Sequence, residues 1–230
     1  MYGKHEDVFY YITLYNENIV HPPMPEGSEE GIVRGLYRFR TAPIEGQHRV
    51  QLLGSGSIMQ SVLRAQAILA EKFEVAADVW SVTSYQQLRH NALAADRWNR
   101  LNPEESPRTA YVSQVLAGVP GPIIAACDYV KAVPDLIRPW VGRQFVSLGT
   151  DGFGLSDTRE GLRRHFEVDA ESVAIAALYA LSQEGEIPAW EVANAIRDLG
   201  VDPGKLDPLH PSIRNPQGQV PDAEAVKLHS

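Results

Sequence analysis

The sequence has one cysteine, no excess of basic residues and no long hydrophobic run. Cys127 cannot form a disulfide within the chain, which fits a reducing compartment. A formal net charge of -8 disfavours a nucleic-acid partner, because neutralising phosphates requires a surplus of lysine and arginine. No apolar run is long enough to span a bilayer, and Met1 to Asp7 is too polar for a signal peptide. We therefore expect a cytoplasmic protein that binds neither nucleic acid nor a membrane.

The motifs of common hydrolases and metal centres are also missing. There is no nucleophile elbow, no HExxH helix and no paired-cysteine metal motif, and the seven histidines are scattered. Cys127 precedes an acidic residue and lacks the neighbouring cation that would lower the pKa of its thiol, so we expect a buried structural thiol. The residues alone identify no catalytic or metal site.

What the sequence does contain is an alternation of short apolar runs and amphipathic helices. Its 230 residues and hydrophobic share of 44% suit one domain with a substantial core. Strands alternating with helices predict a parallel sheet with right-handed crossovers, so the fold class is α/β. We expect strands at residues 8–14, 32–39, 50–53, 77–82, 123–126 and 145–148. We expect helices at residues 58–72, 84–99, 170–184 and 188–199, and Ser84 with Gln87 forms a capping box at the start of the second of these. Residues 111–119 suit either a strand or a helix, and residues 129–140 are expected to be helical in part.

A run of glycine and serine, Gly54 to Ser57, lies between an expected strand and an expected helix. Such a turn presents backbone N–H groups that could hold a phosphate. The run has neither the lysine of a P-loop nor a third glycine at dinucleotide spacing. A tight turn with Ser57 as the helix N-cap is therefore the favoured interpretation.

Phe145 to Asp169 predicts a strand, a glycine-punctuated loop and a helix capped by Asp157, with Asp169 capping the helix that follows. Arg159 and Arg163 are four residues apart and share a helix face. They form either a solvated basic face or a contact with an anion or a partner.

Several runs resemble the carboxyl-terminal region of the homodimeric bacterial pyruvate dehydrogenase E1 family. The similarity covers roughly residues 8 to 202. The matching runs are residues 10–13, 16–18, 24–27, 51–58, 78–84, 149–154, 156–157 and 165–169, together with Arg159.

The resemblance implies a three-layer α/β/α sandwich of the transketolase C-terminal type, with a mostly parallel five-stranded sheet and one antiparallel edge strand. It also implies that the whole enzyme is a homodimer that decarboxylates pyruvate on thiamine diphosphate and Mg²⁺, and reductively acetylates the lipoyl group of the E2 partner. The family's cofactor signature begins with Gly-Asp-Gly, whereas here Thr150 precedes Asp151 and Gly152. No catalytic, cofactor or metal residue is carried over, and we expect this chain alone to be inactive.

We divide the chain into lead-in strands and a connector from a preceding domain (1–45), a transketolase C-terminal-like domain (46–202) and a proline-rich, disordered tail (203–230). Asp151, Phe153, Arg159 and Arg163 are expected at the carboxyl edge of the sheet, in contact with another domain or subunit. Two alternatives stay open. One is a free-standing interaction module of the same fold, and the other is the equivalent domain of another 2-oxo acid dehydrogenase or transketolase-like enzyme.

Overall fold

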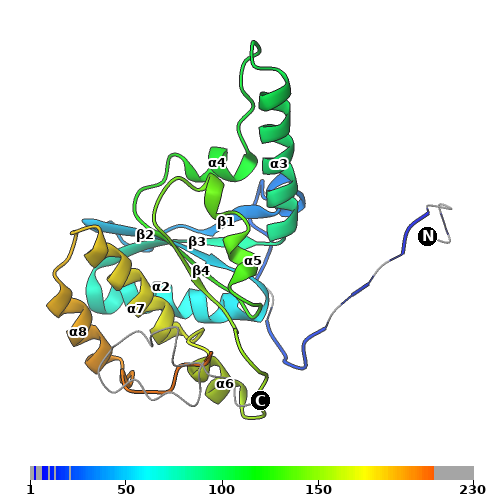
Figure 1. The fold of residues 1–230 in the computed structure, drawn as a ribbon. Coiled ribbons are helices and arrows are strands. Elements are labelled where there is room, and N and C mark those ends of the chain that lie inside the picture. Colours follow the sequence, from blue (N-terminus) through cyan, green and yellow to red (C-terminus); the bar gives the residue numbers. More distant parts are fainter. Residues whose placement is uncertain (1–2, 4–6, 10, 13, 21, 210–230) are drawn as a thin grey trace, which may run out of the picture.

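The computed structural model describes residues 3, 7–9, 11–12, 14–20 and 22–209. Its centre is a five-stranded sheet with the order β1-β3-β2-β4-β5 (Figure 1). The strands are β1 (Leu36–Arg40), β2 (His48–Gly54), β3 (Val75–Val82), β4 (Ile123–Ala126) and β5 (Phe145–Leu148). Edge strand β1 runs antiparallel to β3, and the other neighbours are parallel. The expected mostly parallel sheet with one antiparallel edge strand is confirmed.

Helices cover both faces of the sheet, which gives the expected three layers (Figure 1). One face carries α2 (Met59–Phe73), α7 (Ala170–Gln183) and α8 (Ala189–Asp198), and the other carries α3 (Tyr85–Leu101), α4 (Tyr111–Leu116) and α5 (Ala132–Asp135). The remaining helices are α1 (Glu29–Arg34), α6 (Arg159–His165) and the 3-10 turns Gly56–Ile58 and Arg138–Trp140. None of the helices in the described part of the chain is long and apolar enough to cross a membrane.

Two predicted helix caps are confirmed and two are wrong. The side chains of Ser84 and Asp169 accept hydrogen bonds from backbone N–H groups three residues on. Asp157 does not cap α6. Thr158 does, because its extended backbone turns its hydroxyl toward the N–H of Gly161, at 3.1 Å. Ser57 does not cap α2 either, since it lies inside the preceding 3-10 turn and its hydroxyl points elsewhere.

The expectations for the amino-terminal part need the largest corrections. Residues 8, 9, 11, 12 and 14 form no strand, because no strand in the described part of the chain lies beside them to accept their backbone hydrogen bonds, and all are exposed. Residues 10 and 13 of the predicted strand lie outside the described residues. The strand expected at 32–39 is shared between α1 and β1, and Gly35 ends the helix with a φ of 103°. The ambiguous segment 111–119 contains α4. Pro188 is the N-cap of α8 rather than its first residue. The expected tail lies outside the described residues from 210 onward.

Candidate functional site

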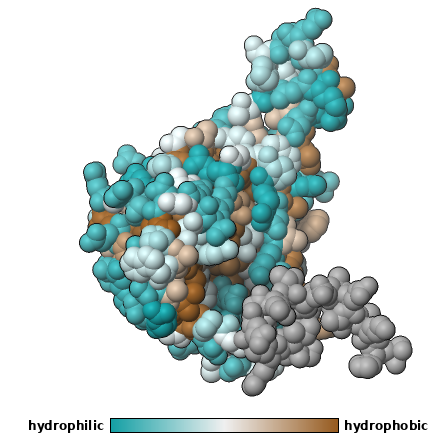
Figure 2. All heavy atoms as spheres, turned by 60° about the vertical axis from the view of Figure 1, so that its left-hand side comes forward, coloured by the Kyte–Doolittle hydropathy of each residue, from teal (hydrophilic) through white to brown (hydrophobic). Residues whose placement is uncertain are grey.

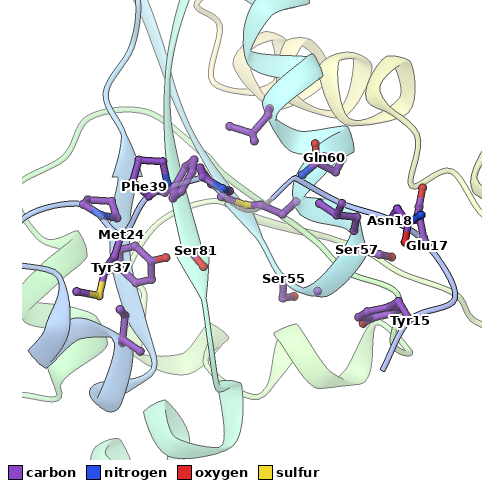
Figure 3. A pocket seen from close by; sticks show the side chains of 18 of the residues that line it. Tyr15, Glu17, Asn18, Met24, Tyr37, Phe39, Ser55, Ser57, Gln60 and Ser81 are labelled. Atoms are coloured by element: carbon purple, nitrogen blue, oxygen red, sulfur yellow. The ribbon is translucent and has the colours of Figure 1, made fainter. Parts of the chain in front are cut away.

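The loops that follow β2, β4 and β5 meet at the carboxyl edge of the sheet. The chain passes from β3 to β4 across β2, so the strand order changes direction between β2 and β4. In open α/β sheets, ligands bind in the crevice at such a point. Here a segment from the amino-terminal part, residues 14–20, lies over that edge; we call it the strap (Figures 1 and 3).

Asp128, two residues after the end of β4, holds the strap at the crevice. Its Oδ2 accepts hydrogen bonds from the Tyr15 hydroxyl at 2.9 Å and from the Ser57 hydroxyl at 3.2 Å. Partial burial, then the hydrogen bond to Asp128 and the charge of that carboxylate, raise the pKa of Tyr15 to about 12. Tyr15 therefore stays protonated near neutral pH and acts as the hydrogen-bond donor of this contact.

The glycine-serine turn packs closely against this pair. Gly56 has a φ of 56°, and a Cβ on it would lie 2.6 Å from the Tyr15 hydroxyl and 3.1 Å from Asp128 Oδ1. The turn thus requires glycine for its conformation and for the close approach. An anion placed on this turn would face the Asp128 carboxylate, so the geometry supports the tight-turn interpretation over a phosphate cradle.

Arg159 and Arg163 do share a face of α6, and both reach the strap. Arg163 Nη2 lies 2.9 Å from Glu17 Oε2, and Arg159 Nε lies 3.8 Å from the same atom. Arg159 also donates to the carbonyl oxygen of Asn16. These contacts join α6 to the strap within one chain.

Asp151 and Phe153, the other two predicted site residues, point to different surroundings. Asp151 Oδ1 accepts a hydrogen bond of 2.8 Å from the backbone N–H of Lys131, which ties the loop after β5 to α5. Phe153 is 90% exposed. Of the four, the structure therefore brings only the two arginines together on a common partner.

A second cluster of polar groups lies just beneath the edge. Cys127 is fully buried, as expected, and its Sγ lies 3.5 Å from the carbonyl oxygens of Tyr129 and Leu148. Burial raises the pKa of this thiol to about 11 and also raises the pKa of the buried Tyr85. Such a thiol is inert rather than nucleophilic at neutral pH.

Two grooves border the strap. The larger one, of about 780 Å³, lies between the strap with residues 22–25 and the sheet edge, and its walls include Tyr37, Phe39 and Gln60 (Figure 3). The smaller one, of about 390 Å³, is lined by α6 and the loop after β5. Among the described residues, no three histidine, cysteine, aspartate or glutamate side chains cluster as a metal site would need.

Sequence reasoning missed Tyr15, Glu17 and Asp128 as members of this site. The available signal was Asp128 itself, a carboxylate at the end of a buried central strand. Its contact with Tyr15 spans 113 positions in the sequence, and no local pattern encodes that pairing.

The strand order, the antiparallel edge strand and the two helical layers define this chain as a three-layer α/β/α sandwich domain. Residues 35–169 match the transketolase-like TK C-terminal domain, and the chain belongs to that family. It is 49% identical over 210 residues to the pyruvate dehydrogenase E1 component of Pseudomonas aeruginosa, and 48% identical over 211 residues to that of Escherichia coli strain K12.

The chain spans about a quarter of the length of these relatives. The first match covers 91% of this chain and 24% of the relative, and the second covers 90% and 23%. Among solved structures, a transketolase from Leishmania mexicana gives a TM-score of 0.44 at 19% identity, over 69% of this chain and 20% of that one.

The groups at the carboxyl edge do not fit thiamine diphosphate with Mg²⁺. The turn that could hold a diphosphate faces Asp128, and the arginines of α6 are paired with Glu17. Two tightly packed hydroxyls and one carboxylate supply too few metal ligands. We assign no catalytic step to this chain.

Proposed function

We propose that this chain is the carboxyl-terminal domain of a pyruvate dehydrogenase E1 component. The whole enzyme would decarboxylate pyruvate on thiamine diphosphate and Mg²⁺ and transfer the acetyl group reductively to the lipoyl group of its E2 partner. The observation that carries the proposal is the 49% identity over 91% of this chain. The cofactor supplies the chemistry of such a reaction, so a domain without its binding site serves the enzyme as structural support.

We propose that the carboxyl edge supports the enzyme by contacting another domain or subunit of a cytoplasmic homodimer. Phe153, at 90% exposure, offers an aromatic anchor of the kind that interfaces bury. Arg159, whose side chain is 52% exposed, retains donors for a second partner beside its contact with Glu17. Asp151 would act indirectly, by fixing the loop that carries Phe153.

The test is an assay of the complete gene product that contains this sequence. With thiamine diphosphate and Mg²⁺ it is expected to reduce ferricyanide in the presence of pyruvate, and far more slowly with 2-oxoglutarate. Equal or preferential use of another 2-oxo acid would overturn the assignment of substrate.

The 230-residue chain provides the second arm of the test. Isothermal titration of this chain with thiamine diphosphate and Mg²⁺ is expected to give no saturable heat. Micromolar binding would contradict the structural role, because it would place the cofactor site within this domain.

A further inference from the structure

The larger of the two grooves at the strap has a wall of irregular chain and a wall of regular structure. The first consists of the strap and the proline-rich residues 22–25, and the second comes from β1 and α2 (Figure 3). Tyr37 and Phe39 of β1 both line the groove, because side chains alternate along a strand. Arg38, between them, lies over the Trp80 ring on the α3 side of the sheet. The volume of about 780 Å³ is within the range of small-molecule sites, roughly 300 to 1,000 Å³.

The groove offers no partner to an anion. Among the described residues that line it there is no lysine, arginine or histidine, and the one charged side chain is that of Glu17. The Glu17 carboxylate is paired with Arg163 at 2.9 Å, and that arginine lines the smaller groove instead. A phosphate or carboxylate placed in the larger groove would lose water without gaining a cation, which costs free energy. A cation would find the Glu17 carboxylate already paired. The groove therefore favours an uncharged molecule.

The uncharged side chains of the groove supply aromatic rings and a buried hydroxyl. Tyr15 of the strap and Tyr37 and Phe39 of β1 contribute three rings, which pack well against the faces and edges of another ring. Ser55 comes directly after β2 and lines the same groove. It is 5% exposed, and its Oγ has no hydrogen-bond partner among the described residues. A polar group of a bound molecule would satisfy this hydroxyl, whose lack of a partner costs free energy.

We propose that the larger groove is a binding site for an uncharged aromatic molecule that carries one hydrogen-bonding group. Its ring system lies between the rings of the strap and those of β1, and its polar group faces Ser55. This site goes beyond the proposed function, because it suits neither the anionic substrate nor the anionic cofactor of that reaction.

A matched pair of fluorescent probes tests the selectivity of the groove. N-phenyl-1-naphthylamine is uncharged, and 8-anilinonaphthalene-1-sulfonate has the same ring system with one sulfonate added. The 230-residue chain is expected to bind the neutral probe at one saturable site. It is expected to bind the anionic probe at least about tenfold more weakly, because the sulfonate finds no cation in the groove. Equal binding of the two probes, or tighter binding of the anion, would overturn the proposal.

A single lysine in the wall of the groove should change this preference. Gln60 is half-buried on α2 and lines the groove. Gln60→Lys is expected to lower the Kd of the anionic probe by about tenfold, because it supplies the missing cation. The identical change at an exposed position of α3, Gln86→Lys, is the control and is expected to leave that Kd unchanged. If both lysines strengthen binding of the anion equally, the probe responds to net charge rather than to the groove, and the proposal is wrong.

A second pair of variants tests where the neutral probe binds. Apolar residues also reach the surface in patches on the side that carries α7 and α8, and a hydrophobic probe can adsorb there (Figure 2). Tyr37→Ala removes a ring from the groove and is expected to raise the Kd of the neutral probe roughly fivefold to tenfold. Tyr179→Ala removes a ring that is 53% exposed on α7 and is expected to leave the Kd unchanged. An equal rise in both variants, or no rise in Tyr37→Ala, would place the probe outside the groove.

The complete gene product separates this inference from the proposed function. If it binds the neutral probe with the same preference over the anion, the site is open in the whole protein, whichever 2-oxo acid that protein uses. If the neutral probe binds the 230-residue chain but not the complete gene product, another part of the protein covers the groove. The ligand site is then wrong, while the assignment as an E1 domain is unaffected.

Discussion

The two faces of the sheet hold their helices by different means. On the α7 face, covered by α2, α7 and α8, the buried cluster is almost wholly small and aliphatic, and alanines of α7 allow close packing. On the α3 face, covered by α3, α4 and α5, the cluster contains Trp80, Tyr85 and Phe145. There the indole N–H of Trp80 donates to Gln51 Oε1 at 2.8 Å, and Gln51 Nε2 donates to the Pro120 carbonyl oxygen at 2.9 Å. The first face depends mainly on packed volume, whereas on the second face a buried indole N–H also needs a hydrogen-bond acceptor.

The largest expected loss of unfolding free energy comes from creating a cavity on the α7 face. Leu69 is fully buried on the 15-residue helix α2, and Leu69→Ala is expected to reduce the free energy of unfolding by about 3 kcal/mol. Leu116 is equally buried but lies on the six-residue helix α4, which can shift into the space. Leu116→Ala is therefore expected to cost less, about 2 kcal/mol. Urea unfolding of both variants measures the difference, and equal losses would remove this distinction between the faces.

A buried glutamine on each face allows a matched test of the hydrogen bonds. Gln51→Leu leaves the Trp80 N–H without an acceptor and is expected to cost about 2 kcal/mol of unfolding free energy. Gln66, buried against the α7 face, donates only to the carbonyl oxygens of Thr41 and Ala77. Gln66→Leu is expected to cost less, because carbonyl oxygens tolerate a missing partner better than N–H groups do.

A double variant tests whether the unpaired indole N–H of Trp80 causes the loss of unfolding free energy in Gln51→Leu. Adding Trp80→Phe to Gln51→Leu removes the orphaned donor together with its former acceptor. The two changes are then expected to cost less than the sum of the single losses in thermal unfolding. Simple additivity would mean that the polar network adds nothing beyond packing.

Removing a helix cap is expected to lower the free energy of unfolding by a smaller amount, which differs between the two faces. Asp169 caps α7 by accepting from Ser172 N at 2.9 Å, and its other oxygen lies 2.5 Å from Arg164 Nε. Asp169→Ala is expected to cost about 1.5 kcal/mol, and Asp169→Asn less, since asparagine keeps the cap. On the α3 face, Ser84→Ala removes only a cap bond of 3.1 Å and is expected to cost about 1 kcal/mol. A larger loss for Ser84→Ala in chemical unfolding would reverse the order.

The sequence predicted the parallel strands of the sheet better than the amino-terminal part of the chain. The strands at 123–126 and 145–148 were predicted to the residue, because each is an apolar run bounded by turn residues. The apolar run from residue 8 to 14 has the same composition, but its described residues have no neighbouring strand among the elements that the structure describes, so composition misled there. Whether an apolar segment is paired depends on tertiary neighbours that local propensity does not contain.

The candidate site, too, was predictable from the sequence only in part. The common face of Arg159 and Arg163 follows from their spacing of four residues and was predicted. Their partner Glu17 lies 146 positions from Arg163, and the strap that carries it has no regular structure to predict. Phe153 was placed in the correct loop, but only the fold reveals that it is exposed.

The smallest expected effect on stability tests the role of the carboxyl edge. Arg159→Ala removes a half-exposed ion pair and is expected to change the unfolding free energy by less than about 0.5 kcal/mol. In the complete enzyme, the same change is expected to weaken dimerisation more than it raises the KM for pyruvate, because Arg159 would contact another domain or subunit. Arg64→Ala is the control, since its side chain is 73% exposed and its ion pair with Glu171 is 3.7 Å long. A raised KM with an unchanged dimer Kd would favour a substrate role for Arg159. A change in neither quantity would mean that α6 presents a solvated face and that its arginines serve only to hold the strap.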